Sequence, residues 1–287
     1  VASMHNTMMF FTEKGRCYWL KVYEIPEGTR ASKGRAIQNV IQIEPDDKVR
    51  AYINTKNLND EEYINNNYIV MCTREGIIKK TKLEAYSRPR QNGVIAIVIR
   101  EGDQLLEAKI TSGESEIMIA ARGGKAIRFP ENKVRPIGRV GAGVRGITLD
   151  EGDEVIGMIV AKDGDRVLTV TETGFGRISE ISDYRVQSRG GKGLINYKTE
   201  KYGDVAAIKV VYDDDDVILI SSDGIIIRMA ASQINTVSRT SKGVRVMRLS
   251  ENEKVVSAIA VREVEEKEAE AEDTSSEAGE TAQNTEE

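Results

Sequence analysis

The chain has 287 residues, 40% of them apolar, so it can bury a substantial core, and we expect most of it to fold as one domain. Its two cysteines form no C-x-x-C pair and its single histidine is His5, which argues against zinc binding or a catalytic thiol and fits a reducing cytoplasm. No run reaches the roughly 20 apolar residues of a membrane span, and the first residues lack the pattern of a signal peptide, so we predict a cytoplasmic protein without membrane contact.

One structural unit is repeated five times. A short apolar strand runs into a turn glycine, a second strand follows, and another glycine comes 17 or 19 residues after the first. From the second unit onward the turn glycines recur every 48 to 50 residues. β-Rich repeats of this length are typical of blades arranged around an axis. The turn glycines are Gly15, Gly76, Gly124, Gly174 and Gly224, and their partners are Gly34, Gly93, Gly143, Gly193 and Gly243.

The strands of each unit follow in chain order. A polar, basic connection leads from the second strand to the second glycine and into a third strand, such as 94–98 or 244–247. An acidic turn then precedes a fourth strand, as at 105–110, 155–160 and 255–261. The first two strands are predicted at 8–11 and 17–22, 68–72 and 77–81, 117–119 and 125–129, 167–170 and 175–179, and 217–220 and 225–229.

Four strands per unit and five units predict a five-bladed, all-β toroid over residues 1–261. A β-sandwich is the alternative, but its strands would not recur with this regular phase. The polar segment 54–67 lengthens the spacing between the first two repeats and is predicted to be a surface insertion. The repeats cover about 1–53, 67–111, 115–161, 165–211 and 215–261.

Charge is segregated along the chain. Residues 262–287 hold 11 acids and 2 bases, a net charge of −9, and without aromatic residues they predict a disordered acidic tail. Residues 1–261 have 39 bases and 35 acids, a net charge of +4. The five windows between paired glycines hold 21 Lys or Arg against 6 Asp or Glu, a net charge of +15. This asymmetry, rather than the total of −5, indicates a polyanionic partner.

The remaining motifs favour neither catalysis nor nucleotide binding. Residues 141–146 match G-x-G-x-x-G, but a strand fragment and a turn follow where a dinucleotide site needs a helix. No G-x-x-x-x-G-K-[ST] occurs. The four aspartates at 213–216 could hold a metal ion, yet such a run before a strand is typical of a solvated turn. Without a nucleophile–base set, the sequence predicts a binding module that uses no cofactor of its own.

The basic connections predict a continuous positive band, because equivalent positions of successive blades lie on one circumference. Such a band suits duplex DNA bent around the rim, since many phosphate contacts are needed to offset the bending cost. Without a base-reading helix we expect sequence-independent binding, and a solvated rim without a partner is the alternative. The band includes Lys79, Lys80, Lys82, Arg128, Lys133, Arg177 and Arg228, and the cations expected to contact DNA are Arg30, Lys33, Arg35, Arg88, Arg90, Arg135, Arg139, Arg145, Arg185, Arg189, Lys192, Arg239, Lys242 and Arg245.

The most specific local feature is Gln187-Ser188-Arg189-Gly190-Gly191-Lys192-Gly193. It resembles the seven-residue box of the C-terminal DNA-wrapping domain of bacterial DNA gyrase A, which reads Gln, a basic residue, Arg-Gly-Gly, a basic residue and Gly. The chain departs from that box at Ser188. Residues 18–26 and 32–35 look like the second blade of the family, and the resemblance covers about 1–261. It implies a β-pinwheel whose blades exchange strands and which wraps DNA with a positive handedness, and Gln187, Gly190, Gly191 and Gly193 join the expected contacts.

Two departures from the family pattern affect what the resemblance implies. Gyrase domains usually have six blades with the box in the first, whereas this chain begins at the equivalent of the second and has its box-like segment in the fourth repeat. Either a first blade with the principal box is missing, or this segment is a repeat-derived copy. The breakage–reunion part with the catalytic tyrosine is also absent, so the chain alone is not expected to be an enzyme.

By resemblance, the complete protein is an ATP-dependent type II topoisomerase that introduces negative supercoils. Its partners would be duplex DNA, the remainder of the gyrase A protein and the gyrase ATPase subunit, in the bacterial cytoplasm at the nucleoid. ATP and Mg²⁺ would belong to the parent enzyme. Two rivals stay open: a weakly wrapping C-terminal domain of topoisomerase IV, and a propeller whose loops bind proteins. The acidic tail is expected to compete with DNA for the rim, or else to serve as a solubilising end.

Overall fold

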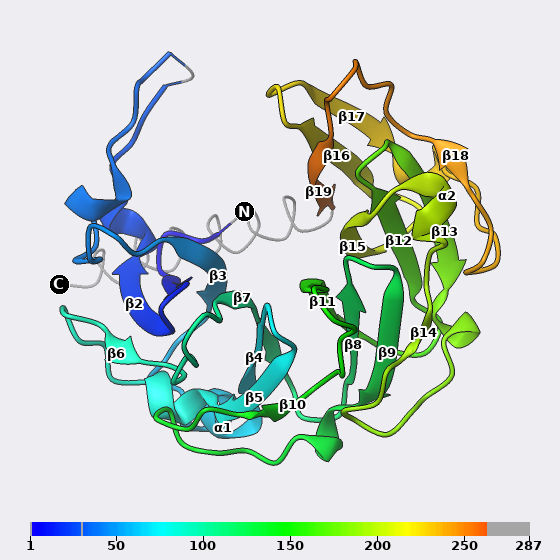
Figure 1. Cartoon of the computed structure of the whole chain (residues 1–287). Coiled ribbons are helices and arrows are strands. Elements are labelled where there is room, and N and C mark those ends of the chain that lie inside the picture. The colour runs from blue at the N-terminus through cyan, green and yellow to red at the C-terminus, as the bar shows by residue number, and fades with distance from the viewer. Residues whose placement is uncertain (1, 30, 263–287) are drawn as a thin grey trace, which may run out of the picture.

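The apolar runs on either side of each turn glycine form the central hairpin of an antiparallel sheet, and five such sheets surround a common axis. Figure 1 shows the computed structural model, an open ring with its opening between the first and the fifth sheet. The structure describes residues 2–29 and 31–262. The prediction of an all-β, propeller-like pinwheel is confirmed. The predicted disordered tail lies outside the described residues, apart from Arg262.

The first four sheets have four strands each, and the fifth has three in the described part of the chain. The first sheet has the order β3 (Val49–Thr55), β1 (Thr7–Thr12), β2 (Arg16–Lys21), β6 (Val94–Ile95). The second has β7 (Leu105–Thr111), β4 (Tyr68–Thr73), β5 (Ile77–Lys82), β10 (Val144–Arg145). The third has β11 (Val155–Ala161), β8 (Glu116–Ala121), β9 (Lys125–Pro130), β14 (Leu194–Ile195). The fourth has β15 (Val205–Val211), β12 (Arg166–Thr171), β13 (Phe175–Glu180), β18 (Val244–Arg245), and the fifth has β19 (Val255–Val261), β16 (Asp216–Ser221), β17 (Ile226–Ala230).

The outermost strand of each four-stranded sheet comes from the following repeat. β6 pairs with β2, β10 with β5, β14 with β9 and β18 with β13, all antiparallel. The sequence pattern places this strand in its own unit, but in the structure it is two residues long and belongs to the preceding sheet. Neighbouring blades therefore exchange strands, as the family resemblance implies.

Both glycines of each unit adopt a positive φ, and at all of them except Gly34 and Gly224 a Cβ would clash with a neighbouring segment. The turn glycine adopts the positive φ that the tight hairpin requires, 82° at Gly76. The second glycine precedes the exchanged strand, where the chain passes close to the preceding sheet. A Cβ at Gly193 would lie only 2.4 Å from the carbonyl oxygen of Ala126. At Gly34, whose segment pairs with no sheet, nothing lies within 4 Å of that position.

Apolar side chains pack between neighbouring sheets. Phe11 of the first sheet and Met71 of the second belong to one buried cluster, and Leu168 of the fourth and Val217 of the fifth belong to another. Burial of each such side chain stabilises the fold by about 1.5–3 kcal/mol. The positions of the blades around the axis therefore depend on the hydrophobic contact between adjacent sheets.

The predicted surface insertion, residues 54–67, contributes to this core. It contains the helix α1 (Glu61–Asn66), whose first turn is capped by Asp60, with the side chain accepting a hydrogen bond from Tyr63 N at 3.1 Å. Leu58 and Ile64 are buried in the cluster between the first two sheets. Because most residues of the segment are polar, the sequence did not predict that Leu58 and Ile64 would be buried.

The other helices are short and lie in connections. None of the helices in the described ranges is long and apolar enough to cross a membrane. Besides α1, the described helices are α2 (Thr199–Tyr202) and the 3-10 helices η1 (Val22–Glu24), η2 (Ile37–Asn39), η3 (Leu83–Tyr86), η4 (Glu131–Lys133), η5 (Ile181–Asp183) and η6 (Ala231–Gln233).

Candidate nucleic-acid interface

The basic connection of each repeat runs along the outer side of the ring. In the third repeat it leaves β9 through η4, and Ile137 N donates to the carbonyl oxygen of Lys80 at 2.9 Å. It ends at β10, after which Gly146 N donates to the carbonyl oxygen of Gly76 at 2.7 Å. Because the exchanged strand is the outermost of its sheet, these hydrogen bonds keep the connection on the outer rim.

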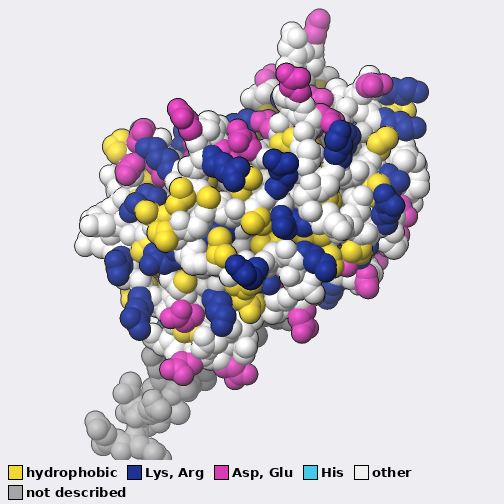
Figure 2. Space-filling model, turned by 60° about the horizontal axis from the view of Figure 1, so that its bottom comes forward, with side chains coloured by type: hydrophobic (Ala, Val, Ile, Leu, Met, Phe, Trp, Pro, Cys, Tyr) yellow, Lys and Arg dark blue, Asp and Glu magenta, His cyan; other side chains and the backbone are white. Residues whose placement is uncertain are grey.

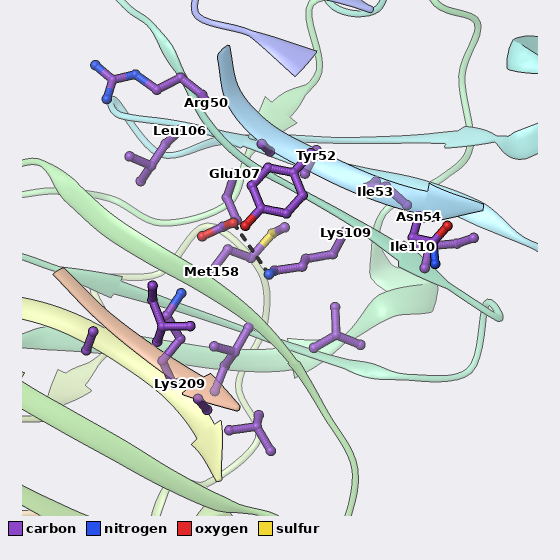
Figure 3. A pocket seen from close by; sticks show the side chains of 18 of the residues that line it. Arg50, Tyr52, Ile53, Asn54, Leu106, Glu107, Lys109, Ile110, Met158 and Lys209 are labelled. Atoms are coloured by element: carbon purple, nitrogen blue, oxygen red, sulfur yellow. Dashed lines mark ion pairs between the residues drawn. The ribbon is translucent and has the colours of Figure 1, made fainter. Parts of the chain in front are cut away.

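The opposite edge of the sheets faces a central cavity of about 710 Å³ (Figure 3). Its walls come from the inner strands β3, β7, β11, β15 and β19, with aliphatic side chains such as Ile110 and Met158. Lys109 lies 3.5 Å from Glu107 there, and burial lowers the pKa of Lys209. The cavity is thus separate from the basic connections, which belong to the other edge of each sheet.

Four cations of the predicted band are buried. Lys79, Lys80, Arg128 and Arg177 each lie on the second strand of their sheet and are at most 5% exposed. The prediction that they belong to a surface band is therefore wrong. Their charged groups contact atoms of the protein's own connections instead.

Lys79 shows what these buried cations do. Its Nζ donates to the carbonyl oxygen of Ala96 at 2.6 Å and to that of Arg139. The first carbonyl belongs to the exchanged segment of its own repeat and the second to the connection of the next repeat. Desolvation, with a smaller effect of the Arg139 charge, lowers the pKa of Lys79 to about 8. The equivalent carbonyl groups for Arg177 are those of Asn196 and Arg239.

Lys80 and Arg128 occupy the next position along the strand and hold the 3-10 helix of the following repeat. Lys80 Nζ lies 2.9 Å from Glu131 Oε1, and both side chains are buried. Arg128 Nη1 donates to the carbonyl oxygens of Ile181 at 2.9 Å and Tyr184 at 3.1 Å. A buried charge needs a partner of this kind, because an unpaired one would cost several kcal/mol. These cations therefore fix the start of the connections in the third and fourth repeats.

Three arginines of the predicted interface connect neighbouring loops of the rim. Each precedes the second glycine of its repeat by four residues and is half-buried. Arg189 Nε donates to the carbonyl oxygen of Lys133 at 3.1 Å, and its Nη1 donates to that of Arg145. The guanidinium groups of these arginines therefore donate hydrogen bonds to backbone carbonyl oxygens of neighbouring loops. The equivalent carbonyl groups belong to Asp183 and Ile195 for Arg239 and to Ile95 for Arg139.

The box-like segment, residues 187–193, is attached to the third repeat. Gly190 N donates to the carbonyl oxygen of Gly146 at 2.8 Å, and Thr148 N donates to that of Gly191 at 2.9 Å. The Thr148 hydroxyl also donates to the Gly190 carbonyl at 2.7 Å. The glycines of the segment thus let two backbones approach closely, in addition to any contact with a ligand.

The remaining cations expected to contact DNA are exposed, and none of them forms an ion pair within residues 2–29 and 31–262. Arg228, another member of the predicted band, is also exposed but lies 2.5 Å from Asp216. Carboxylates pair with other cations, as in Lys14–Glu44 at 3.0 Å and Arg166–Asp213 at 2.8 Å. Arg30 lies outside the described residues. The exposed set comprises Lys33, Arg35, Arg88, Arg90, Arg135, Arg145, Arg185, Lys192, Lys242 and Arg245.

Figure 2 shows the side of the ring on which β5 and β10 lie. Lys and Arg side chains are spread across this face with apolar side chains between them, and most Asp and Glu side chains lie toward its margins. An exposed guanidinium that is not paired with a carboxylate can bind a phosphate through two parallel hydrogen bonds. The arrangement therefore suits a polyanion that extends over more than one blade.

Comparison of the sequence with known proteins identifies one family. The family model of the DNA gyrase C-terminal domain, a beta-propeller, matches residues 6–55, 67–112, 115–162, 165–211 and 215–262. The DNA gyrase A protein of Staphylococcus aureus (strain NCTC 8325) is 41% identical over 264 residues, which are 91% of this chain and 29% of that protein. The chain thus spans less than a third of the length of this relative.

Two solved structures are similar in fold. The C-terminal domain of DNA topoisomerase IV has a TM-score of 0.80 and 26% identity, covering 90% of this chain and 80% of its own. A DNA gyrase A C-terminal domain has a TM-score of 0.77 and 24% identity, covering 90% of this chain and 83% of its own. The second likeness concerns the fold alone.

Proposed function

Because the chain belongs to the family of the DNA gyrase C-terminal β-propeller domain, we propose that its outer rim binds and wraps duplex DNA as part of the gyrase A protein. The observation that carries the proposal is the set of exposed rim cations without carboxylate partners. Binding is independent of base sequence, because the two helices labelled α are too short, at 6 and 4 residues, to read a groove.

The strength of binding follows from the number of phosphates that the rim neutralises at once. Each neutralised phosphate releases condensed counterions, so log affinity falls with log salt at about −0.9 per contact. Bending the duplex over a small ring costs about 1–6 kcal/mol, and contacts on several blades offset that cost together. Wrapping therefore needs free cations on successive connections, as at Arg88, Arg135 and Arg185.

In the complete protein, wrapping by this ring would present DNA to the breakage–reunion part of gyrase A with a fixed handedness. Negative supercoiling would then depend on the ATPase subunit, which supplies ATP hydrolysis. In this account the chain itself is a binding module, and its partners are duplex DNA and the remainder of gyrase.

The proposal is tested by titrating duplex DNA at several salt concentrations. We expect a steep fall of affinity with salt, and an Arg88→Ala, Arg135→Ala, Arg185→Ala variant with a slope reduced by about 2.7. The matched control is Lys14→Ala, Arg166→Ala, Lys254→Ala, which removes three cations that are ion-paired with carboxylates. A slope near zero in the unmodified chain, or equal losses in the two variants, would contradict the proposal.

The structural likeness to the topoisomerase IV domain favours a second candidate, a rim that binds DNA but wraps it weakly. The two candidates differ in topology rather than in affinity. A chain that wraps changes the linking number of closed circular DNA that is relaxed in its presence. A chain that binds with the same salt slope and leaves the linking number unchanged would belong to the second kind.

A further inference from the structure

One cross-strand pair recurs at the outer edge of the first four sheets. It joins the residue after the turn glycine to the second residue of the exchanged strand, and we call it the rim pair. In every rim pair one member is a cation and the other is apolar, and the cation changes strand from each sheet to the next. The rim pairs are Arg16–Ile95, Ile77–Arg145, Lys125–Ile195 and Phe175–Arg245.

In the second and fourth sheets the cation lies on the exchanged strand. Arg145 and Arg245 are exposed there, and neither forms an ion pair with any described residue. Arg245 packs over the ring of Phe175, with Cζ 4.5 Å from the ring centre, which orients the guanidinium without using its donors. Both guanidinium groups are therefore available to a phosphate.

In the first and third sheets the cation lies on the second strand and is engaged. Arg16 Nη2 donates to the carbonyl oxygen of Asn92 at 2.7 Å, and Nε donates to Tyr18 Oη at 3.1 Å. Lys125 Nζ donates to Asp150 Oδ2 at 2.6 Å. Both cations are half-buried. Asp150 neutralises the charge of Lys125, and Arg16 uses two of its donors on acceptors within the protein.

The exchanged strands of these two sheets present isoleucine at the outer position. Ile95 is 42% exposed and Ile195 is 50% exposed. They occupy the same place in the blade as Arg145 and Arg245, with the same pairing to the second strand. The rim therefore alternates between a free guanidinium and an uncharged side chain at one repeated position.

We infer that the rim pairs hold duplex DNA at every second blade, through Arg145 and Arg245, and that the duplex crosses Ile95 and Ile195 without a phosphate contact at this position. This inference rests on the proposed function and refines it, because it assigns unequal roles to blades of similar fold. It also makes Ile95 and Ile195 positions where one substitution adds a contact that the geometry already accommodates.

The test is the salt dependence of duplex binding by the full chain. Ile195→Arg is expected to steepen the slope of log affinity on log salt by about 0.9, and Ile95→Arg by the same amount. Arg145→Ile is expected to reduce the slope by about 0.9, whereas Lys125→Met leaves it unchanged. The matched control is Ile259→Arg, an identical substitution at a 43% exposed position in the central cavity, which leaves the slope unchanged.

Three results would overturn the inference. One is an Ile195→Arg or Ile95→Arg variant that melts like the unmodified chain and has the same slope of log affinity on log salt as the unmodified chain. Another is an Ile259→Arg variant that gains as much as Ile195→Arg, which would show that added charge acts anywhere on the ring. The third is a Lys125→Met variant that loses as much as Arg145→Ile. If the unmodified chain bound no duplex, the proposed function itself would fail. The three results above instead contradict only the inference about the rim pairs, because in them the unmodified chain still binds DNA.

Discussion

The Nζ of Lys79 lies 2.6 Å from the carbonyl oxygen of Ala96, in the segment that leaves the second repeat to complete the first sheet. Strand exchange takes this segment out of its own sheet, so part of its backbone loses ladder partners. A buried carbonyl without a donor costs about 1–3 kcal/mol. The lysine supplies that donor together with the Tyr86 hydroxyl, which donates to the same oxygen at 3.3 Å. The cation is thus part of the architecture rather than of the DNA-binding surface.

Replacement of Lys79 by methionine should change how stability depends on pH. The pKa of Lys79 is lowered from 10.5 to about 8 in the folded state. At pH values above about 8 the unfolded chain therefore binds more protons at this residue, and the free energy of unfolding rises with pH. We expect the unmodified chain to gain roughly 1–3 kcal/mol over Lys79→Met between neutral pH and pH about 10.

Denaturant unfolding of both chains across this range measures the effect. Other titrating groups are common to the two chains and cancel in the difference, while the lost hydrogen bonds add a constant offset. A difference that stays constant with pH would show that Lys79 is not held in a desolvated site.

The second glycines should differ in importance according to what faces them. Gly193 combines a φ of 76° with a carbonyl oxygen 2.4 Å from the place of a Cβ, so Gly193→Ala should destabilise the chain by about 1–3 kcal/mol. Gly34 has a φ of 69° but open space around it, and Gly34→Ala should cost less. Thermal melting of the two variants compares them, and equal losses would refute the role given to the close approach.

Arg189 and Arg185 separate loop positioning from phosphate contact. Arg189 donates to the carbonyl groups of Lys133 and Arg145, so Arg189→Ala should lower the free energy of unfolding by about 1–2 kcal/mol. Arg185 is exposed, and Arg185→Ala should leave stability unchanged while it reduces the salt slope by about 0.9. An Arg189→Ala chain of normal stability with a reduced slope would instead make Arg189 a direct contact.

The acidic tail provides a prediction that rests on charge alone. Residues 262–287 carry a net charge of −9, opposite in sign to the +15 of the five basic windows. Removal of residues 263–287 should therefore tighten duplex binding, most strongly at low salt, where screening is weak. A tail with all its Glu and Asp replaced by Gln and Asn serves as the matched control and should behave like the deletion. Unchanged affinity in both variants would contradict the hypothesis that the tail competes with DNA for the rim.

The repeated hairpins could be predicted from the sequence because their signals are local. A glycine between two apolar runs, repeated every 48 to 50 residues, is sufficient to place the strands around Gly124 and Gly174. The origin of the outermost strand is not a local property. The sequence around Val144 and Arg145 predicts a strand but does not indicate its sheet. Only the packing of neighbouring blades determines that this strand pairs with β5.

The division of the basic residues into buried and exposed ones could not be predicted for a related reason. Lys79, Lys80 and Arg177 stand in strand patterns where a cation normally points to solvent. Their partners are carbonyl and carboxylate groups 17 or more residues away, as in Lys79–Ala96 and Lys80–Glu131. The exposed cations Arg135 and Arg185 follow a 3-10 helix in a polar loop, where composition alone indicates exposure.

The central claim, that the outer rim wraps duplex DNA, is tested most directly by relaxing closed circular DNA with a type I topoisomerase in the presence of the chain. After removal of protein, we expect a linking-number change of positive sign that grows with the ratio of chain to DNA, and a much smaller change with the Arg88→Ala, Arg135→Ala, Arg185→Ala variant. A topoisomer distribution identical to that of DNA relaxed without the chain, at concentrations where the duplex is bound, would contradict the claim.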